Sequence, residues 1–372
     1  MPAPTIVRET PAEPTVAADV VRIGAGAATA VHDALAVEEP LEIHVNGWRW
    51  LVTMRTPGDD ADLVLGMLAS EGVIDSAREV ESLLFRRHPD EPDRANVVDV
   101  RVARPIGEIT ERLARNSALA STSCGLCGAS SVAAVLRHRS PVGHGPEVDG
   151  AILAALPDRL REAQPVFQAT GGLHGAALFD TAGALLAARE DVGRHNAVDK
   201  VIGWRLRTEP RPDAPILLVS GRASFEIVQK ALAADIPIVA AVSAPSSLAV
   251  ALAEEAGMTL AGFVRDGGCN VYAGHARLRD VAVESSDPGR DPSAPGADPL
   301  DFISRVLRTA LDEVGCKISL ADWRALTRSE RQRLARLVDH ASRDDFATYL
   351  VDRVTARTGA PPRRLAPRAA SS

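Results

Sequence analysis

The sequence predicts an α/β protein, with a small α+β region before its main sheet and a helical region after it. Three observations predict this fold class. Apolar strand-like segments alternate with helix-like segments over residues 216–264, an Asn-Gly pair joins two alternating segments over residues 41–55, and a run rich in Pro, Gly and Asp at residues 284–300 precedes a helical pattern. Strand–helix repeats of this kind are typical of a parallel sheet covered by helices on both faces.

Length and composition limit the class of protein. A chain of 372 residues is long enough for roughly two to three domains. The formal net charge of -7 and the pI of about 5.8 argue against a chain-wide electrostatic grip on nucleic acid. Four cysteines do not make a disulfide scaffold in a chain of this length. The sequence also lacks an apolar run of about 18 residues and the apolar core of an export signal. We therefore expect a cytoplasmic protein with free thiols, and neither a nucleic-acid partner nor a membrane partner.

The N-terminal region predicts a small α+β unit. Residues 1–17 are rich in Pro and Ala, which is typical of a flexible tail. In the following hairpin, Asn46-Gly47 supplies the positive φ angles that a two-residue turn needs. Pro57-Gly58-Asp59-Asp60 then ends the strand and starts a helix through about Ser70, and residues 96–104 alternate again as a strand.

A glycine-containing segment earlier in the chain resembles a nucleotide-binding loop only in part. Gly24-Ala25-Gly26 lacks the third glycine of a dinucleotide-binding fingerprint, and no clear strand precedes it. We therefore expect a plain loop here.

Cys124 and Cys127 form a Cys-x-x-Cys pair surrounded by small residues, just before a helix-like segment at residues 129–136. A helix N-terminus stabilises anions, so a thiolate in this position is expected to have a lowered pKa and to be reactive. The same spacing is also found in redox dithiols and in half of a zinc site. The motif alone leaves these three interpretations open.

Two polar loops rich in glycine follow the cysteine pair. Thr170-Gly-Gly-Leu-His174 precedes strand-like segments at residues 176–179 and 184–188, and a loop with Arg194, His195 and Asn196 opens a helix over residues 197–206. Each histidine taken alone is more simply a hydrogen-bonded structural residue. Their combination with Arg and Asn in glycine-flanked loops favours a binding site.

The strand–helix repeats place three more loops at one sheet edge. Strands are predicted at residues 216–219, 237–242 and 258–264, with helices at 225–234 and 248–256 between them. Ligands of such sheets bind outside the carboxyl ends of the strands. The loops at these ends are rich in hydroxyl groups and glycine amides and contain Arg222 and Arg265, which suit phosphate groups. The alternative is that these loops only cap the helices.

Five sequence blocks in this order closely resemble the formate dehydrogenase accessory sulfurtransferases, the FdhD family. The resemblance covers roughly residues 20–280. The blocks are Thr122-Ser-Cys-Gly-Leu-Cys-Gly128, Thr170-Gly-Gly-Leu-His174, Asp191-Val-Gly-Arg-His-Asn-Ala-Val-Asp-Lys200, Ser220-Gly-Arg222 and Gly262-Phe-Val-Arg-Asp-Gly267.

The resemblance implies a fold and a function. The implied fold is a cytidine-deaminase-like α/β sandwich, and the implied protein is a dimer. The implied function is maturation of the molybdenum cofactor for formate dehydrogenase: sulfur arrives from a cysteine desulfurase as a cysteine persulfide and passes to the molybdenum of a bound bis-molybdopterin guanine dinucleotide. The implied partners are therefore the desulfurase and the catalytic subunit of a formate dehydrogenase, which the protein serves as a sulfurtransferase and chaperone.

The resemblance and the residue chemistry together name the candidate site. The resemblance makes Cys124 the persulfide carrier, whereas the sequence alone ranks Cys127 equally. One departure from the family pattern is Gly268 before Cys269, where members often carry a larger residue. By resemblance the cofactor-binding stretch comprises Phe263, Val264, Arg265, Asp266, Gly267 and Gly268. From their chemistry we add Arg194 and Arg222 for charge pairing, His174 and His195 for polar contacts, and Ser220 and Gly221 for hydroxyl and amide contacts.

Two interpretations from other classes use zinc. A zinc-dependent nucleobase deaminase needs His-x-Glu and Pro-Cys-x-x-Cys, but no His-x-Glu occurs in the sequence and Ser123 precedes Cys124. A structural zinc site could combine Cys124 and Cys127 with Cys269 and Cys316. We expect no permanent metal, and stoichiometric zinc in the purified protein is the observation that favours either rival.

The C-terminal region is predicted to be helical. Thr327 and Glu330 fit a capping box, and apolar stripes follow it. Residues 317–337 faintly resemble small nitrate-reductase-associated proteins, and a helical appendage of unknown purpose is the alternative. The predicted domains are a tail at 1–17, the α+β subdomain at 18–115, the α/β sulfurtransferase and cofactor-binding domain at 116–283, a linker at 284–300, the helical extension at 301–358 and a basic tail at 359–372.

Overall fold

The structure is a computed structural model, and it divides the chain into two compact units, Met1–Val281 and Ala282–Ser372. The structure describes residues 4–7, 13–24, 26–87, 96–117, 141–142, 145–279, 307, 310–311, 314–340 and 342–364. The predicted linker at 284–300 lies outside these residues.

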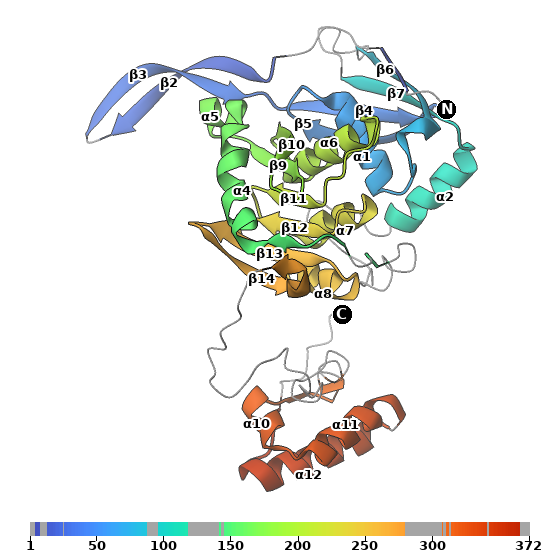
Figure 1. Ribbon diagram of the computed structural model, residues 1–372, viewed down its shortest axis with the longest axis vertical. Helices are drawn as coiled ribbons and strands as arrows, with labels where there is room; N and C mark the ends of the chain where they lie inside the picture. Colours follow the sequence, from blue (N-terminus) through green and yellow to red (C-terminus); the bar gives the residue numbers. More distant parts are fainter. Residues whose placement is uncertain are drawn as a thin grey trace, which may run out of the picture. The chain divides into compact units, whose positions relative to one another are not determined.

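The first unit begins with a mixed sheet of five strands in the order β1-β6-β7-β4-β5 (Figure 1). The β4–β5 hairpin confirms the Asn-Gly prediction, because Asn46 and Gly47 have φ angles of 50° and 83°. The helix predicted to follow is α1, Asp60–Ser70, which buries its apolar residues against this sheet. The other elements are β1 (Thr5–Val7), β4 (Glu39–Val45), β5 (Trp48–Arg55), η1 (Ala77–Glu79), β6 (Val80–Arg86), β7 (Val97–Val102) and α2 (Ile106–Ser117).

The prediction of a flexible tail over residues 1–17 is wrong in two places. Thr5–Val7 forms β1, which pairs in parallel with β6, and β2 begins at Thr15. β2 (Thr15–Gly24) and β3 (Ala27–Ala36) form a separate two-stranded hairpin that extends away from the two larger sheets of its unit (Figure 1). Gly26 lies in the turn of this hairpin, which agrees with the expectation of a plain loop, but Gly24 ends β2, so a strand does precede this segment, contrary to the interpretation of the sequence.

The main sheet of the first unit has six strands in the order β10-β9-β11-β12-β13-β14. β11, β12 and β13 are parallel, as the strand–helix repeats predict, but β9 and β14 are antiparallel to their neighbours, so the sheet is mixed rather than parallel. Apolar segments indicate burial but not direction, which explains the error. The strands are β9 (His174–Phe179), β10 (Leu185–Asp191), β11 (Ile216–Val219), β12 (Ile238–Ala241), β13 (Thr259–Arg265) and β14 (Gly268–Ala273).

Helices cover both faces of the main sheet, as predicted. Successive strand residues point to opposite faces, so Leu217 packs with α6, α7 and α8 while Leu218 packs with α4. The helices are α4 (Gly150–Glu162), α5 (Pro165–Thr170), α6 (Arg194–Arg207), α7 (Phe225–Ala233) and α8 (Ser247–Glu255), and the short elements β8 (Val148–Asp149), η2 (His275–Arg277) and β15 (Leu278–Arg279) complete the unit.

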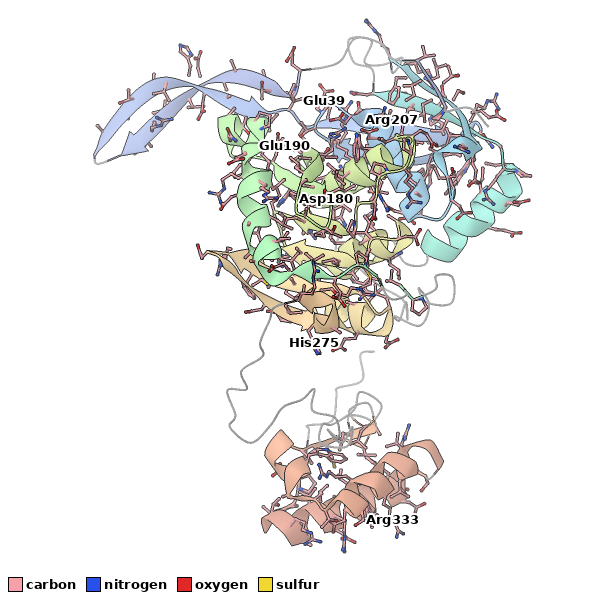
Figure 2. The ribbon with its side chains drawn as sticks, viewed as in Figure 1. Glu39, Asp180, Glu190, Arg207, His275 and Arg333 are labelled. Carbon is pink, nitrogen blue, oxygen red and sulfur yellow. The ribbon has the colours of Figure 1, made fainter. Side chains whose placement is uncertain are left out.

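Helices α1 and α6 join the two sheets of the first unit. Gly66 of α1 lies against the Asp199 carbonyl of α6, and Gly203 of α6 lies against the Asp62 carbonyl of α1. A Cβ atom at either glycine would overlap the facing carbonyl, so glycine is required for this close approach. Arg207, labelled in Figure 2, closes the contact because its Nε lies 2.7 Å from Oδ1 of the buried Asp62.

The second unit contains the predicted helices. Thr327 and Glu330 form the expected capping box, in which the Thr327 amide donates to the Glu330 carboxylate at 2.7 Å and the Glu330 amide donates to the Thr327 hydroxyl at 3.3 Å. Trp323, Leu334, Phe346 and Leu350 form its core. The elements are β16 (Cys316–Lys317), α10 (Leu320–Ala325), α11 (Arg328–His340), α12 (Arg343–Thr358) and β17 (Arg363–Arg364). Among the described helices of the chain, none is both long and apolar enough to cross a membrane.

Candidate functional site

Hydrogen bonds connect the predicted loops along one edge of the main sheet. The Ser220 amide donates to the Gly175 carbonyl, and the Gly175 amide donates to the Ser220 hydroxyl, both at 2.9 Å. The Ser243 amide donates to the Gly221 carbonyl at 3.3 Å, and the Phe263 amide donates to the Ser243 carbonyl at 3.2 Å. β9 begins at the edge where β10, β11, β12 and β13 end, because it runs antiparallel to them. The loop clustering predicted from the strand–helix repeats is therefore confirmed.

His174, Arg194 and Gly221 meet at this edge. A Cβ atom at Gly221 would lie 3.5 Å from Nδ1 of His174 and 3.8 Å from Cδ of Arg194. Burial lowers the pKa of His174, and the positive charges of Arg194 and His195 lower it further. His174 is therefore held mainly as a neutral imidazole at neutral pH.

His195 has a carboxylate partner that sequence reasoning missed. Its Nδ1 lies 2.9 Å from Oε2 of Glu226, the second residue of α7. The hydrogen bond from His195 lowers the pKa of Glu226 against the opposing effect of burial. An acidic residue in the first turn of a helix is common for dipole reasons alone, so its sequence position gave no further signal.

Two buried polar atoms at this edge have no hydrogen-bond partner among the described residues: Nε of Arg194 and Oγ of Ser224. Arg194 opens α6 and Ser224 precedes α7, and within the described chain neither helix has a side-chain cap at its N-terminus. Buried polar groups are nearly always hydrogen-bonded, and exposed amides at a helix start favour anions. The arrangement therefore suits an anionic ligand that accepts hydrogen bonds.

The stretch from Phe263 to Gly268 has an unusual backbone. Phe263 and Asp266 have φ angles of 52° and 53°, a region that non-glycine residues rarely adopt, and the β13–β14 pairing is irregular between them. Backbone strain of this kind is concentrated at functional sites. Val264 is buried in the core on the α4 side of the sheet. Gly267 has a φ of 74°, and no described atom lies within 4 Å of the position that a Cβ atom would take at Gly268, so a larger residue fits there.

The arginines predicted for charge pairing differ in their surroundings. Arg222 and Arg265 are exposed, and 61% of the Arg265 side chain is accessible. The Arg265 guanidinium lies 5.5 Å from the ring centroid of Phe263 and 3.9 Å from the Asp266 carboxylate. Within the described part of the chain, neither Arg222 nor Arg265 has a hydrogen bond or ion pair to His174 or Arg194. Because both side chains are exposed, a ligand can reach them.

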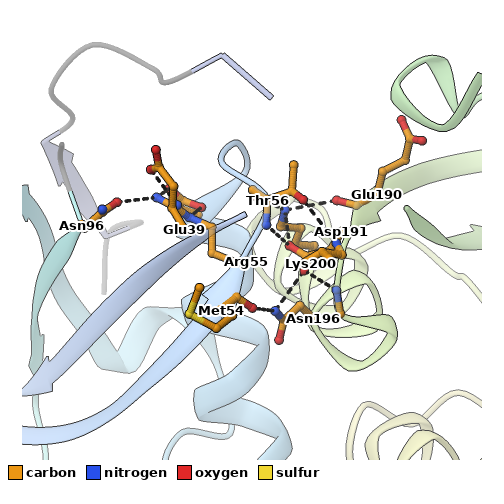
Figure 3. A network of polar contacts seen from close by, with 12 residues as sticks. Glu39, Met54, Arg55, Thr56, Asn96, Glu190, Asp191, Asn196 and Lys200 are labelled. Carbon is orange, nitrogen blue, oxygen red and sulfur yellow. Dashed lines mark hydrogen bonds and ion pairs between the residues drawn. The ribbon is translucent and has the colours of Figure 1, made fainter. Parts of the chain in front are cut away.

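Part of the block from Asp191 to Lys200 connects the two larger sheets of the first unit instead of lying at the loop edge of the main sheet (Figure 3). The buried Lys200 ammonium lies 2.8 Å from the Asp191 carboxylate and donates to the Thr56 carbonyl at 2.9 Å. Asn196 donates to Asp191 at 3.0 Å and to the Met54 carbonyl at 2.8 Å. These residues link α6 to the end of β5. Of this block, Arg194 and His195 therefore remain for a ligand.

Glu190 fixes the neighbouring loop. Its carboxylate accepts hydrogen bonds from the Val166 and Phe167 amides at 3.0 and 2.7 Å, at the start of α5 (Figure 2). The helix ends at Gly171, whose φ of 67° is the left-handed conformation that glycine adopts readily. The loop to His174 is thus anchored at both ends.

Cys124 and Cys127 lie outside the described residues, so their role stays a prediction. Of the remaining cysteines, Cys269 is half-buried, and burial raises the pKa of its thiol, whereas Cys316 is buried in the second unit. Among the described residues, no group of three His, Cys, Asp or Glu side chains is arranged to hold a metal ion.

Comparison with known proteins gives the family. The family model described as FdhD/NarQ matches residues 36–279, and the model of the conserved nitrate reductase-associated proteins matches residues 294–371. The chain is 53% identical over 270 residues to the sulfur carrier protein FdhD of Nocardia farcinica, covering 71% of this chain and 95% of that protein. It is 51% identical over 269 residues to the sulfur carrier protein FdhD of Streptomyces avermitilis, covering 70% and 94%.

A solved structure supports the same assignment. The crystal structure of a protein from Desulfotalea psychrophila, described as a formate dehydrogenase accessory protein, has a TM-score of 0.55 and 25% identity, and the match covers 72% of this chain and all of that one. The α/β fold class is thereby confirmed, while the likeness to cytidine deaminases stays a prediction. The resemblance inferred from the five sequence blocks is correct: the chain belongs to the FdhD/NarQ family.

Proposed function

We propose that this protein is a sulfur carrier that serves a formate dehydrogenase. It receives sulfur from a cysteine desulfurase as a persulfide on Cys124 and transfers it to the molybdenum of a bound bis-molybdopterin guanine dinucleotide. The observation that carries the proposal is the sheet edge at which His174 and Arg194 meet at Gly221. The His195–Glu226 pair lies at the same edge, as do two buried polar atoms without a partner among the described residues. The relatives named as sulfur carrier proteins support the sulfur step.

The sulfur step balances without an external oxidant. The Cys124 thiolate attacks the outer sulfur of the desulfurase persulfide, a new S–S bond forms at Cys124, and the desulfurase cysteine leaves as a thiolate. A neutral sulfur atom has then moved between two cysteines. In the second transfer the outer sulfur leaves Cys124 as sulfide, the metal of the substrate supplies two electrons, and Cys124 returns to a thiolate. Cys127 is positioned in sequence to accept sulfur in turn.

The sheet edge suits the phosphate groups of the guanine dinucleotide. Nε of Arg194 and Oγ of Ser224 are donors without a described partner, and the starts of α6 and α7 add backbone amides. Arg222 and Arg265 are exposed and can pair with phosphate in bidentate fashion. The strained stretch from Phe263 to Gly268 supports a ligand contact there as well. We further propose a cytoplasmic homodimer, with the desulfurase and the formate dehydrogenase subunit as its partners.

The decisive experiment measures sulfur mass on the peptide that contains both cysteines. The protein is incubated with a cysteine desulfurase and cysteine, digested without reductant and analysed by mass spectrometry. A gain of one sulfur atom on this peptide, absent without desulfurase, is expected. If the variant with both cysteines replaced by alanine gains as much sulfur as the native protein, the proposal is contradicted.

A further inference from the structure

Glu226 and His195 join the starts of two helices beside the candidate site. His195 is the second residue of α6, Glu226 is the second residue of α7, and 2.9 Å separates Nδ1 of the ring from Oε2 of the carboxylate. Building on the proposed function, we infer that Glu226 is a positioning residue, which fixes the His195 ring so that its Nε2 serves an anionic group of the bound nucleotide.

The hydrogen bond determines which ring nitrogen is available. A carboxylate can only accept, so Nδ1 of His195 must carry a hydrogen. Because the pKa of Glu226 is lowered, mainly by this hydrogen bond, Glu226 is ionised at neutral pH. Nε2 is then the one ring nitrogen left for a ligand: it accepts a hydrogen bond when the ring is neutral and donates one after protonation. A phosphate oxygen accepts only, so it selects the protonated ring.

Positive groups surround Glu226, so its carboxylate has charges to balance at this position. Arg194 on α6 is positive, His174 on β9 lies beside it, and Lys230 on α7 carries a further positive charge close to Glu226. Glu71, which follows α1, and Asp199 of α6 add negative charge around Lys230. The Glu226 carboxylate offsets the repulsion among these positive groups. The pair therefore adds a second donor, besides Arg194, for a phosphate.

A purely structural tie between the two helices explains the contact less well. α6 and α7 already pack together through Val198, Val201 and Ile227 in a fully buried core. The side chains of His195 and Glu226 are 26% and 42% exposed. Ion pairs exposed to this degree contribute little to stability. The position of the pair at the ligand edge, next to the unpaired Nε of Arg194, favours a role in binding.

The test compares Glu226→Ala and Glu226→Gln with the native protein. Glu254→Gln, which removes one exposed charge near the far end of α8, serves as the control. Two quantities are measured: the hydrogen-bearing ring nitrogen of each histidine by 15N NMR, and the affinity for GDP between pH 5.5 and 8.5. We expect Nδ1 of His195 to carry the hydrogen in the native protein and in Glu226→Gln, but not predominantly in Glu226→Ala.

The affinity for GDP distinguishes a positioning role of Glu226 from a purely structural one. Glu226→Ala is expected to bind GDP about two- to tenfold more weakly at pH 6.5, the range of one hydrogen bond. Glu226→Gln keeps an acceptor for Nδ1 but loses the counter-charge, so it is expected to bind GDP more weakly than the native protein and more tightly than Glu226→Ala. Glu254→Gln is expected to match the native protein in both measurements.

The outcomes separate this inference from the proposed function. If native protein binds GDP and Glu226→Ala has the same affinity and pH profile, the positioning role is wrong and the proposed function stands. If the native ring carries its hydrogen on Nε2, the role is also wrong. If native protein fails to bind GDP at millimolar concentration, the nucleotide site of the proposed function is contradicted, and the positioning role with it.

Discussion

Lys200 and Asp191 form a buried ion pair at the junction of the two sheets of the first unit. Nζ and Oδ2 are 2.8 Å apart, and the two side chains are 2% and 0% exposed. The ammonium also donates to backbone carbonyls of Thr56 and Glu190, so its hydrogens are used on both sides of the junction. A pair of this kind is costly to break from one side, because the remaining charge stays buried.

Lys200→Met is therefore expected to destabilise the first unit by about 3–5 kcal/mol. The reason is that, among the described residues, the Asp191 carboxylate keeps only neutral donors, from Thr56, Gly193 and Asn196. Urea unfolding followed by circular dichroism measures the loss. Arg101→Met, at an exposed position of β7, is the control and is expected to change stability by less than about 0.5 kcal/mol. A loss below about 1 kcal/mol for Lys200→Met contradicts the role assigned to the pair.

A second prediction concerns the close approach of α1 and α6. Gly203→Ala is expected to cost at least about 1–3 kcal/mol, because the new methyl group meets the Asp62 carbonyl and the helices must move apart. Gly107→Ala in α2 is the matched control: no described atom lies within 4 Å of its Cβ position, so the higher helix propensity of alanine should stabilise the protein slightly. Thermal unfolding of both variants tests this prediction. Equal melting temperatures for Gly203→Ala and Gly107→Ala contradict the packing argument.

The sequence predicted the central repeats well because each element there is defined locally. Strands β11, β12 and β13 are short apolar runs bounded by polar loops, and both of their faces are buried. Strand direction is set by pairing between distant segments, so the sequence did not indicate the antiparallel pairing of β9 with β11, and it did not predict β14 as a strand. The β2–β3 hairpin was missed because it is rich in Ala, exposed on most of its residues and lacks a typical turn pair.

The same difference between local and long-range features explains why the sequence predicted only part of the candidate site. Loops at the carboxyl ends of strands can be located from the strand pattern, so the sequence indicates His174, Arg194 and Gly221, which the structure places together. The contacts of Lys200 and Asp191 with Thr56 span more than a third of the chain, and no local pattern indicates them. Glu226 was missed because the feature that distinguishes it, the distance to His195, depends on how α6 and α7 pack.

A third prediction concerns how the stability of the N-terminal sheet depends on pH. A hydrogen bond from Arg49, and a second from His44, lower the pKa of Glu42 below its ordinary value of 4.5. A lowered folded-state pKa stabilises the fold at pH values above the unfolded pKa, and this contribution is lost as the pH falls through the folded pKa. Glu42→Gln should therefore reduce stability at pH 7 and leave it nearly unchanged at pH 3. Urea midpoints from pH 3 to pH 7 test this, and a difference that grows toward low pH has the wrong sign.

The sulfur step gives the fourth prediction. Cys124→Ala should abolish the persulfide that carries sulfur onward, whereas Cys127→Ala should still accept sulfur, because the resemblance assigns the first cysteine as carrier. Cys269→Ala is the control, since that thiol is half-buried and its pKa is raised by burial, which makes it a poor nucleophile. Desulfurase-dependent sulfur mass, measured on each purified variant, is the readout. Unchanged loading of Cys124→Ala together with complete loss in Cys127→Ala would reverse the assignment.

The last prediction separates nucleotide binding from sulfur loading. Arg265 is exposed at the end of β13, and its guanidinium lies over the Phe263 ring instead of in a buried ion pair. Arg265→Ala should weaken GDP binding about ten- to a hundredfold, the range of a lost hydrogen bond to a charged group. Arg265→Lys should fall between native and alanine, because it keeps the charge but loses the planar fork.

Sulfur loading should survive both changes, since the reactivity of Cys124 is expected to come from its own sequence surroundings. Conversely, Cys124→Ser should keep the native affinity for GDP and lose sulfur transfer. Arg279→Ala, at an exposed position of β15, controls for the general loss of a positive charge. Circular dichroism must first show that each variant is folded, because Arg265 also takes part in the irregular β13–β14 pairing. If Arg265→Ala loses persulfide loading but binds GDP like the native protein, the two roles do not divide between the sheet edge and the cysteine pair as proposed.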